Sequence, residues 1–126
     1  MKAARLEAPG KASVVEVDKP QIGPDDVLIQ VKAAGICGTD VHIYKGEYEA
    51  TYPLIPGHEF SGIVSAVGDN VTRFSVGQRV TADPNVPCNR CPACQRNEPN
   101  QCHNLGAIGV TTNGSFAEYV KAPEGN

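Results

Sequence analysis

The segment Val27-Leu28-Ile29-Gln30-Val31-Lys32-Ala33 carries the clearest structural pattern in the sequence. Its odd-numbered positions are all apolar, and the polar Gln30 and Lys32 lie between them. Because successive side chains of a β-strand point to opposite faces, this alternation is typical of a strand with one buried face. Gly35 follows and ends the pattern. The segment therefore predicts a strand that packs one side against an apolar core.

On either side of this strand, further short segments favour extended structure and are separated by turn residues. The 13 glycines and 10 prolines make up about 18% of the chain, against about 12% in an average protein. A short helix is expected over residues 40–45, with Thr39 as its N-cap and Gly46 at its end. Together these patterns predict a mainly β fold, a small β-barrel or folded sheet. The other expected strands are residues 14–18, 60–67, 76–82 and 116–122.

Length and composition indicate one ordinary globular domain of 126 residues, 40% hydrophobic and 20% charged. The formal net charge is -3 and the basic residues are scattered, which disfavours nucleic-acid binding. The longest apolar runs, such as Ile63–Val67, are far shorter than the roughly 20 residues that span a membrane. Glu7 stands where a secretory signal would need apolar residues. We therefore expect a cytoplasmic protein with neither nucleic-acid nor membrane partners.

Four of the five cysteines lie close together in the segment 83–104, which has almost no apolar periodicity. Their spacing is Cys88-x2-Cys91-x2-Cys94-x7-Cys102, and the short intervals let successive thiolates turn inward on one ion. Four thiolates complete the tetrahedral shell of zinc and leave no open position, which is typical of a structural site. The metal would supply folding free energy that this segment cannot obtain from a core of its own. We expect a structural zinc lobe over residues 83–104.

Other interpretations of these cysteines are unrelated surface thiols or an iron–sulfur cluster. The bacterial ferredoxin run is C-x2-C-x2-C-x3-C-P, and the chain shares only its first two intervals. The third interval is seven residues long, and Cys102 is followed by His103 rather than proline. His103 is an alternate zinc ligand or a bystander beside Cys102. Zinc is the favoured metal.

A second set of metal-binding residue types consists of Cys37, His58 and Glu59. They flank separate predicted strands, as convergent metal ligands often do. A catalytic zinc needs three protein ligands and one open position, which such a set could provide. On composition alone, a buried cysteine and a hydrogen-bonded histidine are the commoner explanation of the first two residues, and the sequence around them is what favours a metal site.

The sequence around these residues resembles that of the zinc-dependent medium-chain alcohol dehydrogenases. The matching motifs are Cys37-Gly38-Thr39-Asp40-Val41-His42 and Gly57-His58-Glu59-x2-Gly62-x5-Gly68-x2-Val71. The four-cysteine lobe follows at the separation seen in that family's structural zinc lobe. Within the family, the segments Cys37–Tyr44 and Leu54–Glu59 are most similar to the polyol and threonine dehydrogenases.

The resemblance implies a GroES-like, partly open β-barrel that forms the catalytic domain over residues 1–126. Cys37 and His58 would bind the catalytic zinc, with Glu59 as a direct ligand or a nearby carboxylate. Asp40 would accept a hydrogen bond from the ring N–H of His58 and so fix its tautomer. Thr39 would take the proton of the substrate hydroxyl. His42 would relay it to solvent through the cofactor ribose.

Each role has a simpler alternative in the residues themselves. Thr39 could act only as a helix cap, and His42 could be a solvated surface residue. Asp40 could favour the helix N-terminus through the macrodipole.

In the reaction that the resemblance implies, the zinc would act as a Lewis acid toward the alcohol while a hydride passes to NAD or NADP. The product would be a ketone or aldehyde.

The chain departs from the resembled enzymes mainly because it carries no G-x-G-x-x-G motif. We therefore expect the Rossmann NAD(P)-binding domain to lie outside this chain, and the chain alone to be inactive. The full-length enzyme would act on a small alcohol or polyol as a homodimer or homotetramer. Gln78, where the family usually has aspartate, would change only a local turn. A non-catalytic zinc-binding GroES-like module and an iron–sulfur electron carrier are the alternative functions.

Overall fold

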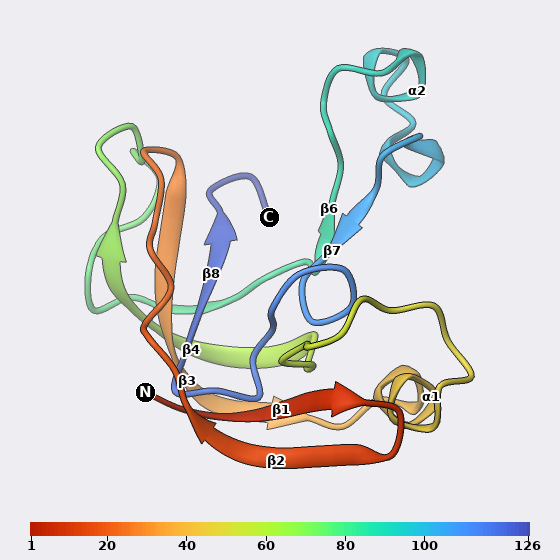
Figure 1. Ribbon diagram of the computed structural model, residues 1–126. Coiled ribbons are helices and arrows are strands. Elements are labelled where there is room, and N and C mark those ends of the chain that lie inside the picture. Colours follow the sequence, from red (N-terminus) through yellow and green to blue (C-terminus); the bar gives the residue numbers. More distant parts are fainter.

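The computed structural model describes residues 1–126 and consists of three antiparallel sheets, two short α-helices and one 3-10 turn (Figure 1). Strand β3 lies inside a four-stranded sheet with the order β5-β4-β3-β8, while β1 pairs with β2 and β6 with β7. The elements are β1 (Lys2–Ala8), β2 (Lys11–Glu16), β3 (Asp26–Gly35), α1 (Gly38–Lys45), β4 (Glu59–Val67), β5 (Arg79–Thr81), β6 (Asn85–Val86), α2 (Pro92–Gln95), η1 (Pro99–Gln101), β7 (Gly106–Ala107) and β8 (Tyr119–Pro123).

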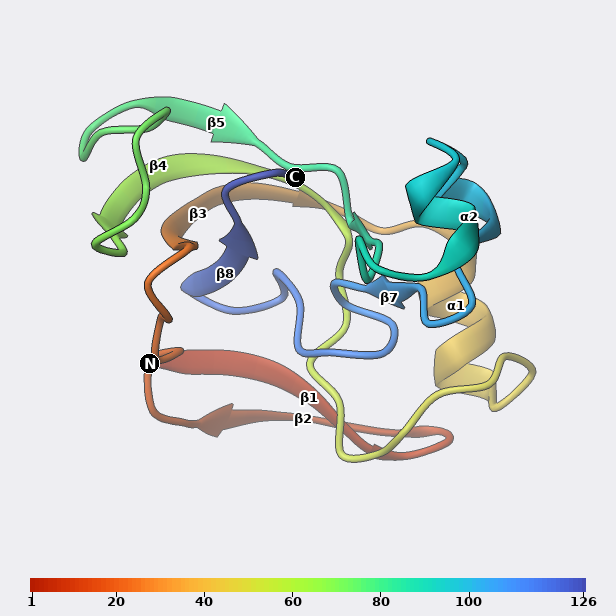
Figure 2. The same ribbon diagram turned by 90° about the horizontal axis from the view of Figure 1, so that it is seen from above.

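Seen from above, the strands enclose the middle of the molecule without closing completely (Figure 2). The sheet of β3, β4 and β5 curves around one side, and the β1–β2 hairpin lies opposite it. Segments around β7 and β8 run between them. The arrangement confirms the predicted mainly β, partly open barrel.

The main core lies on one face of the four-stranded sheet. Val27 and Ile29 of β3 are buried there beside Val64 and Val120, as the alternation in β3 predicts. Ala33 is exposed instead, because the pairing register with β4 shifts between Val31 and Ala33. The apolar row of β3 is therefore continuous only as far as Val31.

Several predicted strand boundaries differ from the structure. Strand β1 was not expected from the sequence, because only Ala3 and Leu6 are buried between charged residues. The strand expected over 76–82 is reduced to the three residues of β5, since Val76 lies in an exposed turn. The last strand begins at Tyr119 rather than at 116. Strand β2 occupies 11–16 rather than 14–18.

Helix α1 packs through Ile43 on a second apolar cluster with Leu6, Leu54 and Val110. The prediction that Thr39 is its N-cap is wrong, because the N-cap is Cys37. The Asp40 side chain accepts the Cys37 N–H at 2.8 Å, so a carboxylate at the third helical position replaces the threonine cap. At the other end Gly46 adopts a left-handed conformation with φ 75°, as a glycine C-cap requires.

Residues 87–105 form a lobe that projects from the barrel on the two-stranded base of β6 and β7 (Figure 1). Cys91 and Ala93 are its only buried apolar residues. The lobe therefore lacks an apolar core, as the sequence predicted, and its short helices need another source of stability. The helices are all too short and too polar to span a lipid bilayer.

Candidate metal centres

Cys37, His58 and Glu59 are brought together by the pairing of β3 with β4. Gly35, the last residue of β3, lies opposite Glu59, the first residue of β4. Cys37 follows Gly35 by two residues, and His58 precedes Glu59 by one, so all three side chains gather at one end of this strand pair. Their sulfur, nitrogen and carboxylate oxygen atoms lie within 4.8 Å of one another. The set offers one soft and two harder donors around a single point.

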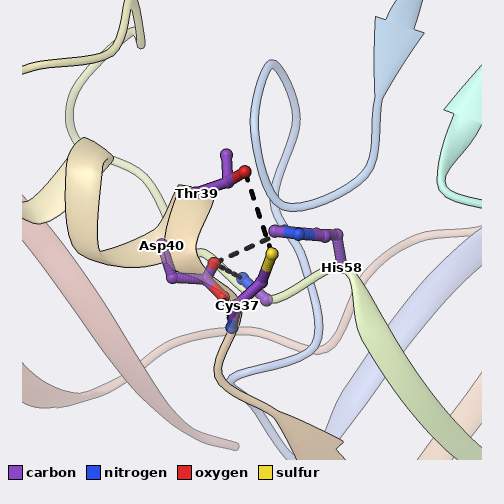
Figure 3. Close-up of polar contacts among 5 residues, drawn as sticks. Cys37, Thr39, Asp40 and His58 are labelled. Carbon is purple, nitrogen blue, oxygen red and sulfur yellow. Dashed lines mark hydrogen bonds and ion pairs between the residues drawn. The ribbon is translucent and has the colours of Figure 1, made fainter.

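Asp40 links the two segments that carry these side chains (Figure 3). Its carboxylate is 5% exposed. One oxygen accepts the backbone N–H of Cys37 at 2.8 Å, and the other accepts the backbone N–H of Gly57 at 3.2 Å. The second oxygen also lies 3.4 Å from Nδ1 of His58. A single buried carboxylate thus fixes the backbone at Cys37 and next to His58.

The imidazole of His58 is nearly buried, with 12% of its side chain exposed. Its Nδ1 forms no hydrogen bond, since the 3.4 Å separation from Asp40 is longer than the usual N–H···O distance of about 2.9 Å. A carboxylate on this side favours a proton on Nδ1 and leaves the lone pair of Nε2 for a metal. The structure places Asp40 beside the Nδ1 of His58, and the predicted hydrogen bond between them stays a prediction.

The two residues expected to move a proton have different surroundings. Thr39 Oγ1 lies 3.8 Å from the Sγ of Cys37, beside the cluster (Figure 3). The side chain of His42 is 58% exposed, and its Nδ1 lies 2.8 Å from Glu47 Oε2. Glu47 is not predicted from the sequence as a partner of His42, because it follows the helix end at Gly46. Ser115, whose buried Oγ has no partner, was also missed, since nothing in the sequence marks it.

The four cysteines of the lobe also converge, with all sulfurs within 4.8 Å of one another. Cys91 Sγ lies 3.5 Å from Cys94 Sγ and 4.0 Å from Cys102 Sγ. A tetrahedral zinc with Zn–S bonds of about 2.3 Å separates its sulfurs by about 3.8 Å. The observed spacing fits one ion better than a multi-iron cluster, whose separate irons hold the thiolates farther apart.

Backbone N–H groups around the lobe stabilise thiolates. Hydrogen bonds from the backbone of Cys94 and then of His103 lower the pKa of Cys91 to about 6. The backbone of Arg90 and then of Cys91 lowers the pKa of Cys88. Burial raises the pKa of Cys94 to about 12, so this thiol needs a cation to ionise at neutral pH. His103 contributes its backbone, and its side chain is exposed.

Comparison with known proteins identifies the family. The profile described as the alcohol dehydrogenase GroES-like domain matches residues 23–126. D-arabinitol dehydrogenase 1 of Uromyces fabae is 46% identical over 96% of this chain, which covers 35% of that protein. L-threonine 3-dehydrogenase of Symbiobacterium thermophilum is 49% identical over 100% of this chain, which covers 37% of that protein.

Among solved structures, a provisionally assigned zinc-binding dehydrogenase from Sinorhizobium meliloti 1021, bound to NADP, superimposes with a TM-score of 0.95. It is 50% identical, and the match covers 99% of this chain and 36% of that one. The fold is thus shared with proteins that are named as dehydrogenases. The chain belongs to the alcohol dehydrogenase GroES-like domain family. It spans just over a third of the length of the curated relatives that it matches.

Proposed function

We propose that this chain is the catalytic domain of a zinc-dependent alcohol or polyol dehydrogenase that uses NAD or NADP. One observation carries the proposal: a thiol, an imidazole and a carboxylate from two segments have their donor atoms within 4.8 Å of one another. Asp40 lies buried behind them and can orient the imidazole. Three protein donors with room for substrate are what a catalytic zinc requires, whereas a structural site would be closed.

The residues in and beside this cluster would have two kinds of role, metal binding and proton transfer. Cys37, His58 and Glu59 would hold the ion, and a bound zinc supplies Lewis acidity toward the substrate oxygen. The hydroxyl of Thr39, beside Cys37, would accept the proton of the substrate hydroxyl and release its own proton through the cofactor ribose toward His42. His42, which is exposed and paired with Glu47, would pass the proton to solvent. NAD or NADP, bound in the whole enzyme, would supply the hydride acceptor.

The four-cysteine lobe would hold a second zinc with a purely structural role. Cys88, Cys91, Cys94 and Cys102 leave no open position on a tetrahedral ion. The lowered pKa values of Cys88 and Cys91 support binding because a metal takes the thiolate form. With almost no apolar core of its own, the lobe would depend on this ion for its order.

The substrate would be a small hydroxylated molecule. The relatives are named for D-arabinitol and L-threonine, so polyols and hydroxy amino acids form the panel to test first. We further propose that the protein acts in the cytoplasm, where its five free cysteines stay reduced. The proposed assembly is a homodimer or homotetramer, as the family resemblance suggests.

Metal analysis of the full-length gene product tests the proposal. Mass spectrometry under native conditions should find two zinc ions per subunit. Cys37→Ser should remove one of them together with dehydrogenase activity, while Cys91→Ser should remove the other. Iron in place of zinc would support the electron carrier instead. Undiminished turnover in Cys37→Ser would contradict the catalytic assignment of this cluster.

A further inference from the structure

Gly35 and Glu59 face each other across the β3–β4 pair, at the edge of the Cys37 cluster. A Cβ atom on Gly35 would lie 2.9 Å from Oε2 of Glu59, tighter than nearly all real Cβ contacts. Directly opposed residues of an antiparallel pair project their side chains to the same face. The Glu59 carboxylate therefore occupies the space that a side chain at position 35 would fill.

Nothing else in the structure requires glycine at this position. Gly35 is exposed and is not among the glycines with positive φ. The nearest backbone atom to its hypothetical Cβ is the carbonyl oxygen of Glu59 at 3.8 Å, an ordinary contact. The one close contact is with the flexible end of the Glu59 side chain. A methyl group at position 35 would thus displace the carboxylate and leave the strand in place.

We propose that Gly35 is a positioning residue for the metal site: its missing side chain lets the Glu59 carboxylate fold over β3 toward Cys37 and His58. The inference rests on the proposed function, since it concerns the same metal cluster. In a strand, alanine is normally more favourable than glycine. Gly35→Ala is therefore expected to keep or raise the stability of the fold while it weakens metal binding. If Gly35 had a purely structural role, Gly35→Ala would lower both the stability of the fold and the metal binding.

The test uses the full-length protein with Co2+ in place of zinc. The visible absorption that disappears in Cys37→Ser reports this cluster, because the four-cysteine lobe keeps its own ligands. Gly35→Ala should shift that part of the spectrum and weaken Co2+ binding in a chelator competition about tenfold, the lower end of the loss seen when a residue that orients a metal ligand is changed. The matched control is Gly38→Ala, whose Cβ would meet nothing within 4 Å. It should retain the wild-type spectrum and affinity.

A double variant decides whether Gly35 acts through Glu59. In the Glu59→Ala background, Gly35→Ala should cause no further change in spectrum or affinity. The inference is overturned if Gly35→Ala matches the wild type, or if it shifts the spectrum equally without Glu59. If the wild type has no Co2+ absorption that depends on Cys37, the proposed function fails, and this inference fails with it. The outcomes therefore separate the two failures.

Discussion

Asp40 accepts a hydrogen bond at 3.2 Å from the backbone N–H of Gly57, although the two residues lie 17 positions apart in the chain. Its other oxygen accepts the N–H of Cys37 at 2.8 Å. The carboxylate therefore joins the start of helix α1 to the segment that precedes β4. Because Cys37 and His58 belong to these two segments, one buried side chain adds to the β3–β4 pairing in fixing the spacing of the two donors.

Asp40→Asn should lower both the free energy of unfolding and the metal affinity of the cluster. An amide has one accepting oxygen, so one of the two backbone N–H groups at Cys37 and Gly57 loses its acceptor. We expect a loss of about 1–3 kcal/mol in unfolding free energy, the usual cost of an unsatisfied buried group. Metal affinity should fall about 10- to 100-fold. Urea denaturation and chelator competition measure the two effects, and Asp69→Asn, in an exposed turn, is the control. Equal metal affinity in the two variants would contradict the orienting role of Asp40.

Gly57→Ala should destabilise the fold more than Gly10→Ala. Both glycines have positive φ, +97° and +72°, which costs an alanine about 1–2 kcal/mol. At Gly10 nothing lies within 4 Å of the added Cβ. At Gly57 it would lie 2.5 Å from a ring carbon of Phe116, so about 1–3 kcal/mol of overpacking is added. Denaturant midpoints of the two variants give the comparison. Equal midpoints would show that this close packing does not constrain the segment before His58.

Cys91→Ser should disorder the lobe and spare the barrel. The variant loses one of four thiolates, and the segment has almost no apolar core to compensate. We expect the loss of one metal ion per chain and rapid protease cleavage within residues 88–102, while the amides of β3 and β4 remain protected from hydrogen exchange. Cys37→Ser is the matched control and should leave the lobe resistant. Full metal content and resistance in Cys91→Ser would contradict the structural zinc site.

Glu124 should make folding stability depend on pH in the acidic range. The backbone N–H groups of Arg73 and then Thr72 lower its pKa below the ordinary 4.5. Since the folded-state pKa lies below the unfolded-state pKa, the stabilisation is present above pH 4.5 and is lost as the pH falls through the folded-state value. The stability difference between wild type and Glu124→Gln should therefore shrink on acidification. Glu49→Gln, at an exposed site, controls for general charge effects. A difference independent of pH would contradict the linkage.

Strong local patterns made part of the fold predictable. The strand expected over 27–33 is present as β3. It was predictable because its buried face gives a clear alternation of apolar and polar residues. Strand β1 carries charges at Arg5 and Glu7 and shows no such alternation, and its pairing with β2 depends on contacts that the sequence does not reveal. The strand expected over 76–82 is shortened by a turn in which the Gln78 side chain accepts the N–H of Ser75 at 2.8 Å.

The members of both clusters were predictable because cysteine, histidine and carboxylate spacing reflects metal chemistry. The structure brings each predicted ligand set together, and the assignment of zinc to them stays a prediction. The contacts of Asp40 with Cys37 and Gly57, and the space at Gly35, were not predictable. They arise from strand register and from the path of the chain between α1 and β4.

The chain enters and leaves the lobe through β6 and β7, where Asn85 pairs with Ala107 and Val86 with Gly106. Its entry and exit therefore lie side by side, as the two ends of a hairpin do. Residues 87–105 can change in length or sequence during evolution without altering the register of β3 and β4. The same attachment makes this segment a natural position for a graft, in which a short turn or a foreign loop replaces it.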